Sequence, residues 1–230
     1  MGVDAPQLRW LVRAREEIVP QAGCAMRLGV LSGTFNPPTR AHLQLAGAAA
    51  RQLALDEVLF VVPEIPPHKA KLAAGLADRE EMLRRAVAGE PRFSAAVSSH
   101  GLLVDIHSAL APHYPAATLA FFLLGRDAAE RILVRWSYAD RAKALAEMFE
   151  RFEIAVAERE GRFELAADNP AACYAGKLHP LTLPPEWALV SATEIRDRAA
   201  KGESLDDALV AEVAAYIAER GLYRGAGGSS

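Results

Sequence analysis

The sequence predicts an α/β fold, a doubly wound Rossmann-like parallel sheet with C-terminal helices. Short, continuous apolar runs alternate with longer stretches of helical periodicity. The runs are apolar along their whole length, which indicates strands that are buried on both faces, as in a parallel sheet covered by helices. The length of 230 residues is ample for one such domain and its core.

Each predicted strand is short, contains β-branched or aromatic residues and carries few polar ones. The strands are expected at Arg27–Ser32, Val58–Val62, Leu119–Leu124 and Phe152–Ala157. Helical spacing and good helix formers predict helices over Ala41–Leu53, Asp78–Ala88, Ala128–Leu133 and Asp140–Glu150. This alternation is typical of βαβ units.

The two ends of the chain carry weaker patterns. Residues 1–25 are predicted to be an N-terminal extension, residues 26–224 the main domain and residues 225–230 a flexible tail rich in Gly and Ser. Within the extension, apolar residues at helical spacing between two prolines predict one short amphipathic helix. These residues are Leu8, Leu11, Val12 and Ile18.

Two helices are predicted near the C-terminus. Ser191-Ala-Thr-Glu194 has the pattern of a capping box that opens the first helix, and Ser204-Leu-Asp-Asp207 has a similar pattern that opens the second. The second helix then places its apolar residues on one face. They are Leu205, Leu209, Val213 and Ile217.

Composition excludes several functions. Lys and Arg number 26 against 29 Asp and Glu, a formal net charge of −3, so we expect no nucleic-acid partner, since such binding needs a basic surface. Cys24 and Cys173 lie far apart, which predicts neither a zinc site nor a disulfide. No run is long enough to span a membrane or to serve as a signal peptide, so we expect a cytoplasmic protein with no membrane partner. The oligomeric state stays open.

The loop after the first strand contains the most informative residues. The first strand-to-helix connection of an open parallel sheet lies at its ligand-binding edge, and a helix amino terminus there presents N–H groups to an anion. Thr39 and His42 lie near the start of this helix on one face, where both could contact phosphate oxygens. The alternative is that Thr39 only caps the helix and His42 is an ordinary surface or core histidine.

The segment Ser32-Gly-Thr-Phe-Asn-Pro-Pro-Thr-Arg-Ala-His42 resembles the first signature of the nucleotidyltransferase superfamily, most closely that of the nicotinate or nicotinamide mononucleotide adenylyltransferases. The resemblance implies that Gly33, Thr34 and Phe35 shape a loop that binds ATP phosphates. It also implies that Thr39 and His42 are catalytic contacts to phosphate.

Two further segments match this family. Pro-Pro-His-Lys69 follows the second predicted strand, and the resemblance implies that Lys69 reaches the acceptor. Gly125 and Asp127 end the third predicted strand and precede Trp136, which implies contacts to ribose and stacking on the acceptor ring. The alternatives are a solvated lysine, an aspartate that caps a helix and a tryptophan in the core.

The segment Leu189-Val-Ser-Ala-Thr-Glu-Ile-Arg196 resembles the second nucleotide signature of the family. It implies that Ser191 and Thr193 bind phosphate and that Arg196 is a catalytic residue that binds the triphosphate. Ala192 stands where the family has a serine. Residues 93–118 depart most from the family pattern, in a region that encloses the acceptor ring, so the identity of the acceptor stays open.

The implied reaction is attack by the phosphate of a small acceptor on the α-phosphorus of ATP, with Mg²⁺ as the accompanying ion and no protein metal site. An ionised phosphate needs no general base, so catalysis is positioning and charge stabilisation. Two alternatives remain open. One is transfer from another donor or to another acceptor, such as cytidylyl transfer; the other is a catalytically silent nucleotide-binding protein.

Overall fold

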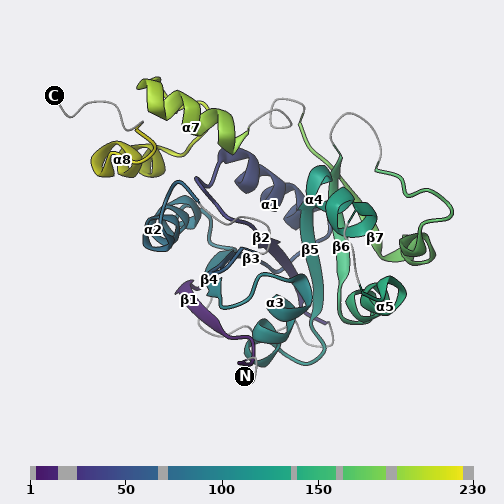
Figure 1. Cartoon of the computed structure of the whole chain (residues 1–230). Helices are drawn as coiled ribbons and strands as arrows, with labels where there is room; N and C mark the ends of the chain where they lie inside the picture. The colour runs from purple at the N-terminus through teal and green to yellow at the C-terminus, as the bar shows by residue number, and fades with distance from the viewer. Residues whose placement is uncertain are drawn as a thin grey trace.

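The structure is a computed structural model that describes residues 4–14, 25–66, 72–135, 139–158, 163–184 and 191–224. Its centre is a seven-stranded sheet with the order β1-β4-β3-β2-β5-β6-β7 (Figure 1). In chain order the strands are β1 (Leu8–Val12), β2 (Arg27–Ser32), β3 (Glu57–Pro63), β4 (Phe93–Ser98), β5 (Leu119–Gly125), β6 (Glu153–Glu158) and β7 (Leu178–Thr182).

The path of the chain through the sheet reverses between β2 and β5. From β2 the chain adds β3 and then β4 on one side, and it later returns to pair β5 with the other side of β2. These pairings and those of β6 and β7 are parallel. The doubly wound α/β prediction is therefore confirmed, and ligands of such sheets bind at the reversal, beyond the carboxyl ends of the strands.

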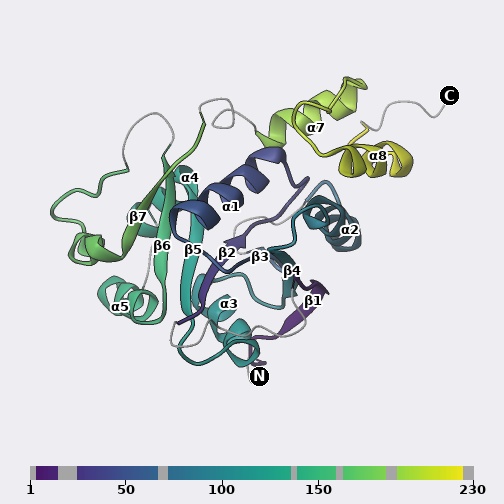
Figure 2. The same cartoon turned by 180° about the vertical axis from the view of Figure 1, so that it is seen from behind.

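Helices cover both faces of the sheet (Figure 2). The α-helices are α1 (Arg40–Gln52), α2 (Leu76–Val87), α3 (Leu103–Leu110), α4 (Arg126–Glu130), α5 (Arg141–Arg151), α7 (Ala192–Lys201) and α8 (Ala211–Arg220). Apolar side chains of α1 and α2 pack on one face, and those of α3, α4 and α5 pack on the other. Shorter turns are η1 (Ala111–His113), η2 (Arg131–Arg135) and η3 (Pro170–Lys177).

The two C-terminal helices form a separate cluster with α2. In both views α7 and α8 lie together beside α2 and the start of α1 (Figures 1 and 2). Ile195 and Ala199 of α7 and Val213 and Ile217 of α8 pack with Met82 of α2 in one buried cluster. This packing places the second predicted nucleotide segment, at the start of α7, next to the loop that precedes α1.

The prediction of a helix over residues 8–18 is wrong where the structure describes the segment, because Leu8–Val12 forms β1, an antiparallel edge strand on β4. Leu8 and Trp10 pack against the core on one face of the sheet, and Leu11 and Val12 pack against the other. An edge strand with apolar residues on both faces and a register shift after Trp10 imitates helical spacing. Ile18 lies outside the described residues, as does the tail over residues 225–230.

The second predicted capping box is also wrong, because α8 begins at Ala211. Asp207 instead pairs with Arg198 of α7 at 2.6 Å, which holds the Ser204 segment in a turn. The expected apolar face of the helix is nonetheless buried, since Leu205, Leu209, Val213 and Ile217 all belong to the core.

Other differences concern boundaries and strands that the pattern did not reveal. The helix expected over Ala128–Leu133 is α4 followed by a π-helical turn, η2. The strands β4 and β7 were not predicted; β4 is buried throughout although it contains Ser94 and Ser98. In the described part of the chain, no helix has the length and apolar character needed to cross a membrane.

Candidate functional site

The loop between β2 and α1 is built around a buried aromatic ring. Phe35 is buried and has a positive φ of 45°, a conformation that is uncommon for any residue but glycine. A Cβ atom added to Gly33 would lie 3.3 Å from Cζ of the Phe35 ring, so a larger residue there would crowd the ring. Gly33 and Phe35 therefore pack together within the loop, and the binding of ATP phosphates by this loop stays a prediction.

Thr39 and His42 form a reciprocal cap at the start of α1. Thr39 is the N-cap residue and is only 2% exposed. Its backbone N–H donates to Nδ1 of His42 at 3.0 Å, and its Oγ1 lies 2.8 Å from the same nitrogen. Thr39 and His42 therefore cap the helix together, and the structure does not show capping to be the sole role of either residue. A direct contact between Thr39 and a phosphate stays a prediction.

The cap determines the tautomer of His42. A backbone N–H only donates, so Nδ1 must be an acceptor without a proton, and the neutral ring carries its proton on Nε2. The ring also lies edge-on to Phe35, with 5.2 Å between centroids. His42 is thus an oriented N–H donor at the ligand-binding edge of the sheet.

The N–H groups at the start of α1 are less available than the sequence suggested. The N–H of Arg40 donates to the carbonyl of Ala208 at 2.8 Å, and the N–H of His42 is used within the cap. The helix dipole still favours an anion at this end. Side-chain donors must therefore carry more of any phosphate binding than the helix terminus does.

Arg196 joins the two predicted nucleotide segments. Its Nη1 donates to the backbone carbonyl of Asn36 in the first loop at 2.9 Å, and its Nη2 donates to Oγ1 of Thr193 at 2.9 Å. A guanidinium has five N–H donors, so it can hold both oxygens and still offer N–H groups to a phosphate. Ser191 is the N-cap of α7, where its Oγ accepts from the N–H of Thr193 at 3.3 Å.

A second guanidinium lies beneath the same loop. Arg79 of α2 is only 3% exposed, and its Nη1 donates to the carbonyl of Thr34 at 3.3 Å. Its Nε has no hydrogen-bond partner among the described residues, and burial lowers the pKa of the group. The residue lies outside both recognised segments, so sequence reasoning missed it; the only signal is an arginine among the buried positions of α2.

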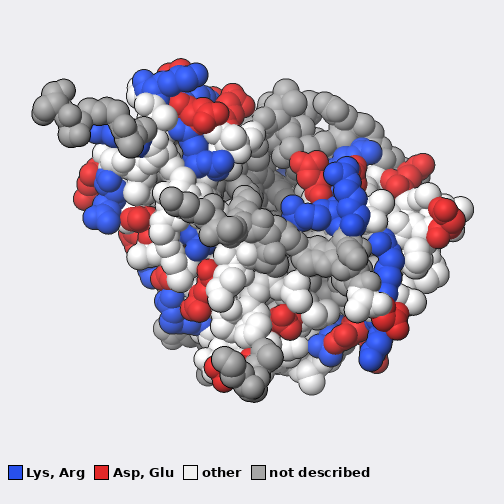
Figure 3. Space-filling view, in the orientation of Figure 1, with Lys and Arg blue, Asp and Glu red and all other residues white. Residues whose placement is uncertain are grey.

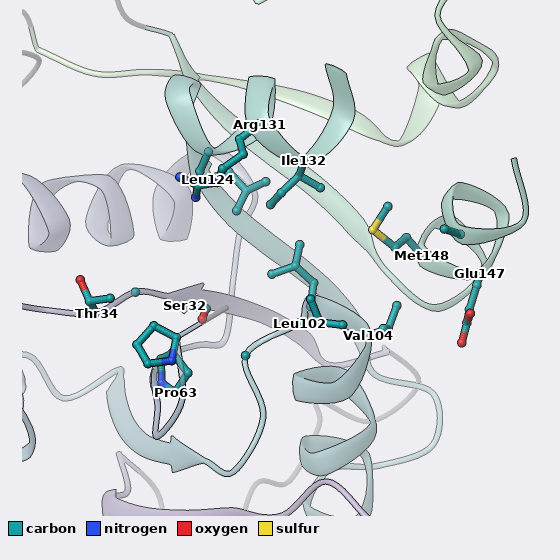
Figure 4. A pocket seen from close by; sticks show the side chains of 16 residues that line it. Ser32, Thr34, Pro63, Leu102, Val104, Leu124, Arg131, Ile132, Glu147 and Met148 are labelled. Atoms are coloured by element: carbon teal, nitrogen blue, oxygen red, sulfur yellow. The ribbon is translucent and has the colours of Figure 1, made fainter. Parts of the chain in front are cut away.

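A cavity of about 390 Å³ opens on the other side of the loop. Figure 4 shows Thr34 and Pro63 on one side of it and Met148 on the opposite side. Its walls come from the carboxyl ends of β2, β3 and β5 and from the helices α3, α4 and α5. They include Ser32, Gly33, Thr34, Pro63, Leu102, Leu103, Val104, Leu124, Arg131, Ile132, Glu147 and Met148. The cavity therefore lies at the reversal of strand order.

The lining is mostly apolar, with two charged side chains. Glu147 pairs with Arg151 at 2.8 Å, so its charge is balanced. The Arg131 backbone N–H donates to carbonyls of α4, but its guanidinium makes no hydrogen bond or ion pair with any residue that the structure describes. The cavity thus suits a small apolar ring with an anionic substituent. Over this face of the molecule Lys and Arg are mixed with Asp and Glu (Figure 3), so positive charge is local.

The remaining predicted residues are only partly placed. Gly125 ends β5, and Asp127 is exposed in the first turn of α4. Neighbouring Arg126 donates to Glu130 at 3.1 Å. Lys69 and Trp136 lie outside the described residues, so nothing places them in the site.

A metal-binding cluster is absent from the part of the chain that the structure describes, since no three His, Cys, Asp or Glu side chains come together there. Mg²⁺ often keeps several waters and is bound through substrate phosphates with one or two carboxylates rather than in a protein cage.

Comparison with known proteins identifies the family. A family model described as cytidylyltransferase-like matches residues 30–198. A Bordetella pertussis protein named "probable nicotinate-nucleotide adenylyltransferase" is 34% identical over 206 residues, which cover 86% of this chain and 98% of the relative. The chain belongs to the nicotinate-nucleotide adenylyltransferase family. A relative of the same name from Thermus thermophilus is 35% identical over 204 residues, covering 86% of this chain and all of the relative.

Solved structures support the fold of the adenylyltransferase family. The nicotinic acid mononucleotide adenylyltransferase of Plasmodium falciparum, solved in complex with NaAD, matches with a TM-score of 0.64 at 18% identity, over 86% of this chain and 97% of that protein. An adenylyltransferase-like structure from Vibrio parahaemolyticus matches with a TM-score of 0.57 at 13% identity, over 87% of this chain and 96% of that one. At such identities the likeness concerns the fold alone.

Proposed function

We propose that this chain transfers the adenylyl group of ATP to nicotinate mononucleotide, forming a dinucleotide and pyrophosphate in the synthesis of NAD. The observation that carries the proposal is the placement of an apolar cavity at the strand reversal, directly against a loop to which Arg196 of the second nucleotide segment is bonded. Relatives that align over nearly their whole length with this chain are named for the same reaction.

His42 is the residue best arranged to assist the transfer. Attack by an ionised phosphate on the α-phosphorus needs no base, but negative charge grows on the bridging oxygen as pyrophosphate leaves. Nε2–H of His42 is a donor whose direction is set by Thr39 and by the Phe35 ring. Thr39 therefore assists the reaction by orienting the His42 ring. A direct contact between the Thr39 hydroxyl and a phosphate would be a second contribution.

Arg196 and its neighbours are assigned to the triphosphate. Arg196, Thr193 and Ser191 lie at the start of α7, and the guanidinium reaches the first loop. The positive end of the α7 dipole and the Arg196 guanidinium both favour negative charge at the start of α7, where the triphosphate is proposed to bind. Gly33 and Thr34 line the loop that would face the nucleotide.

The cavity is assigned to the acceptor ring. Apolar side chains such as Leu103 and Met148 fit a pyridine ring. The Arg131 guanidinium would pair with the carboxylate that nicotinate carries on this ring. Three residues complete the proposal from the resemblance alone: Asp127 for ribose, Trp136 for stacking and Lys69 for the acceptor phosphate.

Mg²⁺ is proposed to arrive on the triphosphate, where it would neutralise charge on the phosphate oxygens. Among the described residues, the donors proposed for the triphosphate are His42, Ser191, Thr193 and Arg196. Residues 26–224 are proposed as the catalytic domain. The expectations of a cytoplasmic location and of no nucleic-acid partner also remain predictions.

A pyrophosphate-release screen tests the proposal. ATP and CTP are each paired with nicotinate mononucleotide, nicotinamide mononucleotide and phosphopantetheine in the presence of Mg²⁺. Release is expected to be fastest with ATP and nicotinate mononucleotide. Faster release with CTP or with phosphopantetheine would instead support the alternative donor or acceptor, and no release from any pair would support a silent nucleotide-binding protein.

A further inference from the structure

The last described turn of the chain reaches back to the first nucleotide loop. Tyr223 follows α8, which is capped at its C-terminal end by Gly221 in a left-handed conformation. The Tyr223 hydroxyl donates to Oδ1 of Asn36 at 2.8 Å, although the two residues are 187 positions apart. The same oxygen accepts the backbone N–H of Ala74 at 3.2 Å. Two separate segments therefore hold one side-chain oxygen.

The backbone of Asn36 leads directly to Arg196. Asn36 is only 4% exposed, and its carbonyl accepts Nη1 of Arg196 at 2.9 Å. A side chain bonded on one side and a carbonyl bonded on the other leave this residue little freedom to rotate. Tyr223, Asn36 and Arg196 thus form a continuous chain of hydrogen bonds from the C-terminal turn to the guanidinium proposed to bind the triphosphate.

Tyr223 has a backbone conformation that requires support from its surroundings. Its φ is 63°, a value that non-glycine residues seldom adopt and keep only where neighbouring contacts determine it. Burial raises the pKa of its phenol, while the nearby cations Arg196 and Arg79 oppose that rise. The hydroxyl is therefore protonated and can donate throughout the physiological range.

We infer that Tyr223 is a positioning residue for ATP, acting through Asn36 to hold Arg196 against the first nucleotide loop. Without the hydroxyl, Oδ1 of Asn36 accepts only the N–H of Ala74. The Asn36 residue can then rotate, and its backbone carbonyl no longer has a single orientation toward Arg196. Arg196 would then sample arrangements that do not match the triphosphate. The inference rests on the proposed function for its substrate, but its contacts are independent of the acceptor.

A purely structural role is the competing account, because the Tyr223 ring also packs against the cluster formed by α2, α7 and α8. Tyr223→Phe separates the two, since it keeps the ring and removes only the hydroxyl. Tyr216→Phe is a matched control: the Tyr216 hydroxyl donates to Oδ1 of Asp78 at 2.9 Å, joining α8 to α2 without a bond to the nucleotide loops.

The experiment compares both variants with the wild-type chain by steady-state kinetics, thermal unfolding and calorimetric titration with a non-hydrolysable ATP analogue. Tyr223→Phe is expected to raise KM for ATP and the Kd of the analogue about 3- to 10-fold, the effect that loss of one neutral hydrogen bond usually has on binding. KM for the acceptor is expected to stay unchanged. Tyr216→Phe is expected to leave all three constants unchanged.

Equal constants for Tyr223→Phe and the wild-type chain would overturn the inference, as would equal increases in both variants. The titration keeps this test separate from that of the proposed function. A wild-type chain that binds the analogue but transfers no adenylyl group would defeat the proposed function, while the change in Kd on Tyr223→Phe would still decide the role of Tyr223.

Discussion

Nδ1 of His42 accepts the backbone N–H of Thr39 at 3.0 Å, so the imidazole proposed to act on the leaving group is also half of a helix cap. The two roles use different ring nitrogens, Nδ1 for the cap and Nε2 for the phosphate. The cap therefore orients the ring without competing for the proton that it donates. The helix cap and the proposed chemistry at the start of α1 therefore depend on the same side chain.

Replacement of His42 tests the catalytic role. His42→Ala is expected to lower kcat at least about 100-fold, a typical loss for one donor to developing charge. It also removes the reciprocal half of the cap, so the free energy of unfolding is expected to fall by about 1 kcal/mol. Steady-state assays and urea denaturation measure the two effects. Near-normal turnover would remove His42 from the reaction.

Thr39 allows a matched pair of variants. Thr39→Ser keeps the hydroxyl at the N-cap and is expected to stay close to wild type. Thr39→Ala loses the bond to the His42 ring, with an expected fall of about 3- to 10-fold in kcat and about 1 kcal/mol in stability. A loss of kcat by Thr39→Ala as large as that of His42→Ala would show instead that Thr39 contacts the phosphate directly.

Arg131 is expected to select the acceptor by charge. Arg131→Ala should lower kcat/KM for nicotinate mononucleotide about 10- to 100-fold, as for loss of a hydrogen bond between charged groups, and change the value for nicotinamide mononucleotide far less. Arg135→Ala is the control, since it removes an exposed arginine that pairs with Glu130. Equal losses for the two acceptors would contradict a role in charge recognition.

The edge strand β1 is expected to support stability rather than catalysis. Trp10 packs against the core, and the Arg13 guanidinium lies 4.3 Å from its ring centroid. Trp10→Ala should lower the free energy of unfolding by about 2 kcal/mol, less than for a fully buried tryptophan, with kcat unchanged. Arg9→Ala, which breaks an exposed pair with Glu80, should cost at most about 1 kcal/mol. Denaturation curves and steady-state assays on both variants measure the two effects. A Trp10→Ala chain with a lower kcat and no loss of stability would contradict a purely structural role for β1.

The features predicted correctly from the sequence are local ones. The strand before Gly33, the cap at Thr39 and the helix after Ser191 each depend on residues adjacent in the chain, where spacing carries information. β1 was misread because both of its faces carry apolar residues and a register shift after Trp10 puts Val12 on the same face as Leu11, so that Leu8, Leu11 and Val12 keep helical spacing.

The contacts that complete the site are long-range, so no pattern reveals them. Arg79 reaches Thr34 from α2, and Tyr223 reaches Asn36 from the far end of the chain. Asn36 belongs to the recognised loop, but its partners become evident only when α7 and α8 pack against α2. The cavity likewise joins residues from strands and helices that are far apart in sequence.

The most direct measurement identifies the product of one reaction mixture by mass spectrometry. Wild-type chain, ATP, Mg²⁺ and nicotinate mononucleotide should yield nicotinate adenine dinucleotide and pyrophosphate in a one-to-one ratio, and the His42→Ala chain should yield almost none in the same time. Consumption of ATP without the dinucleotide, or equal yields from the two chains, would contradict the proposed adenylyl transfer at this site.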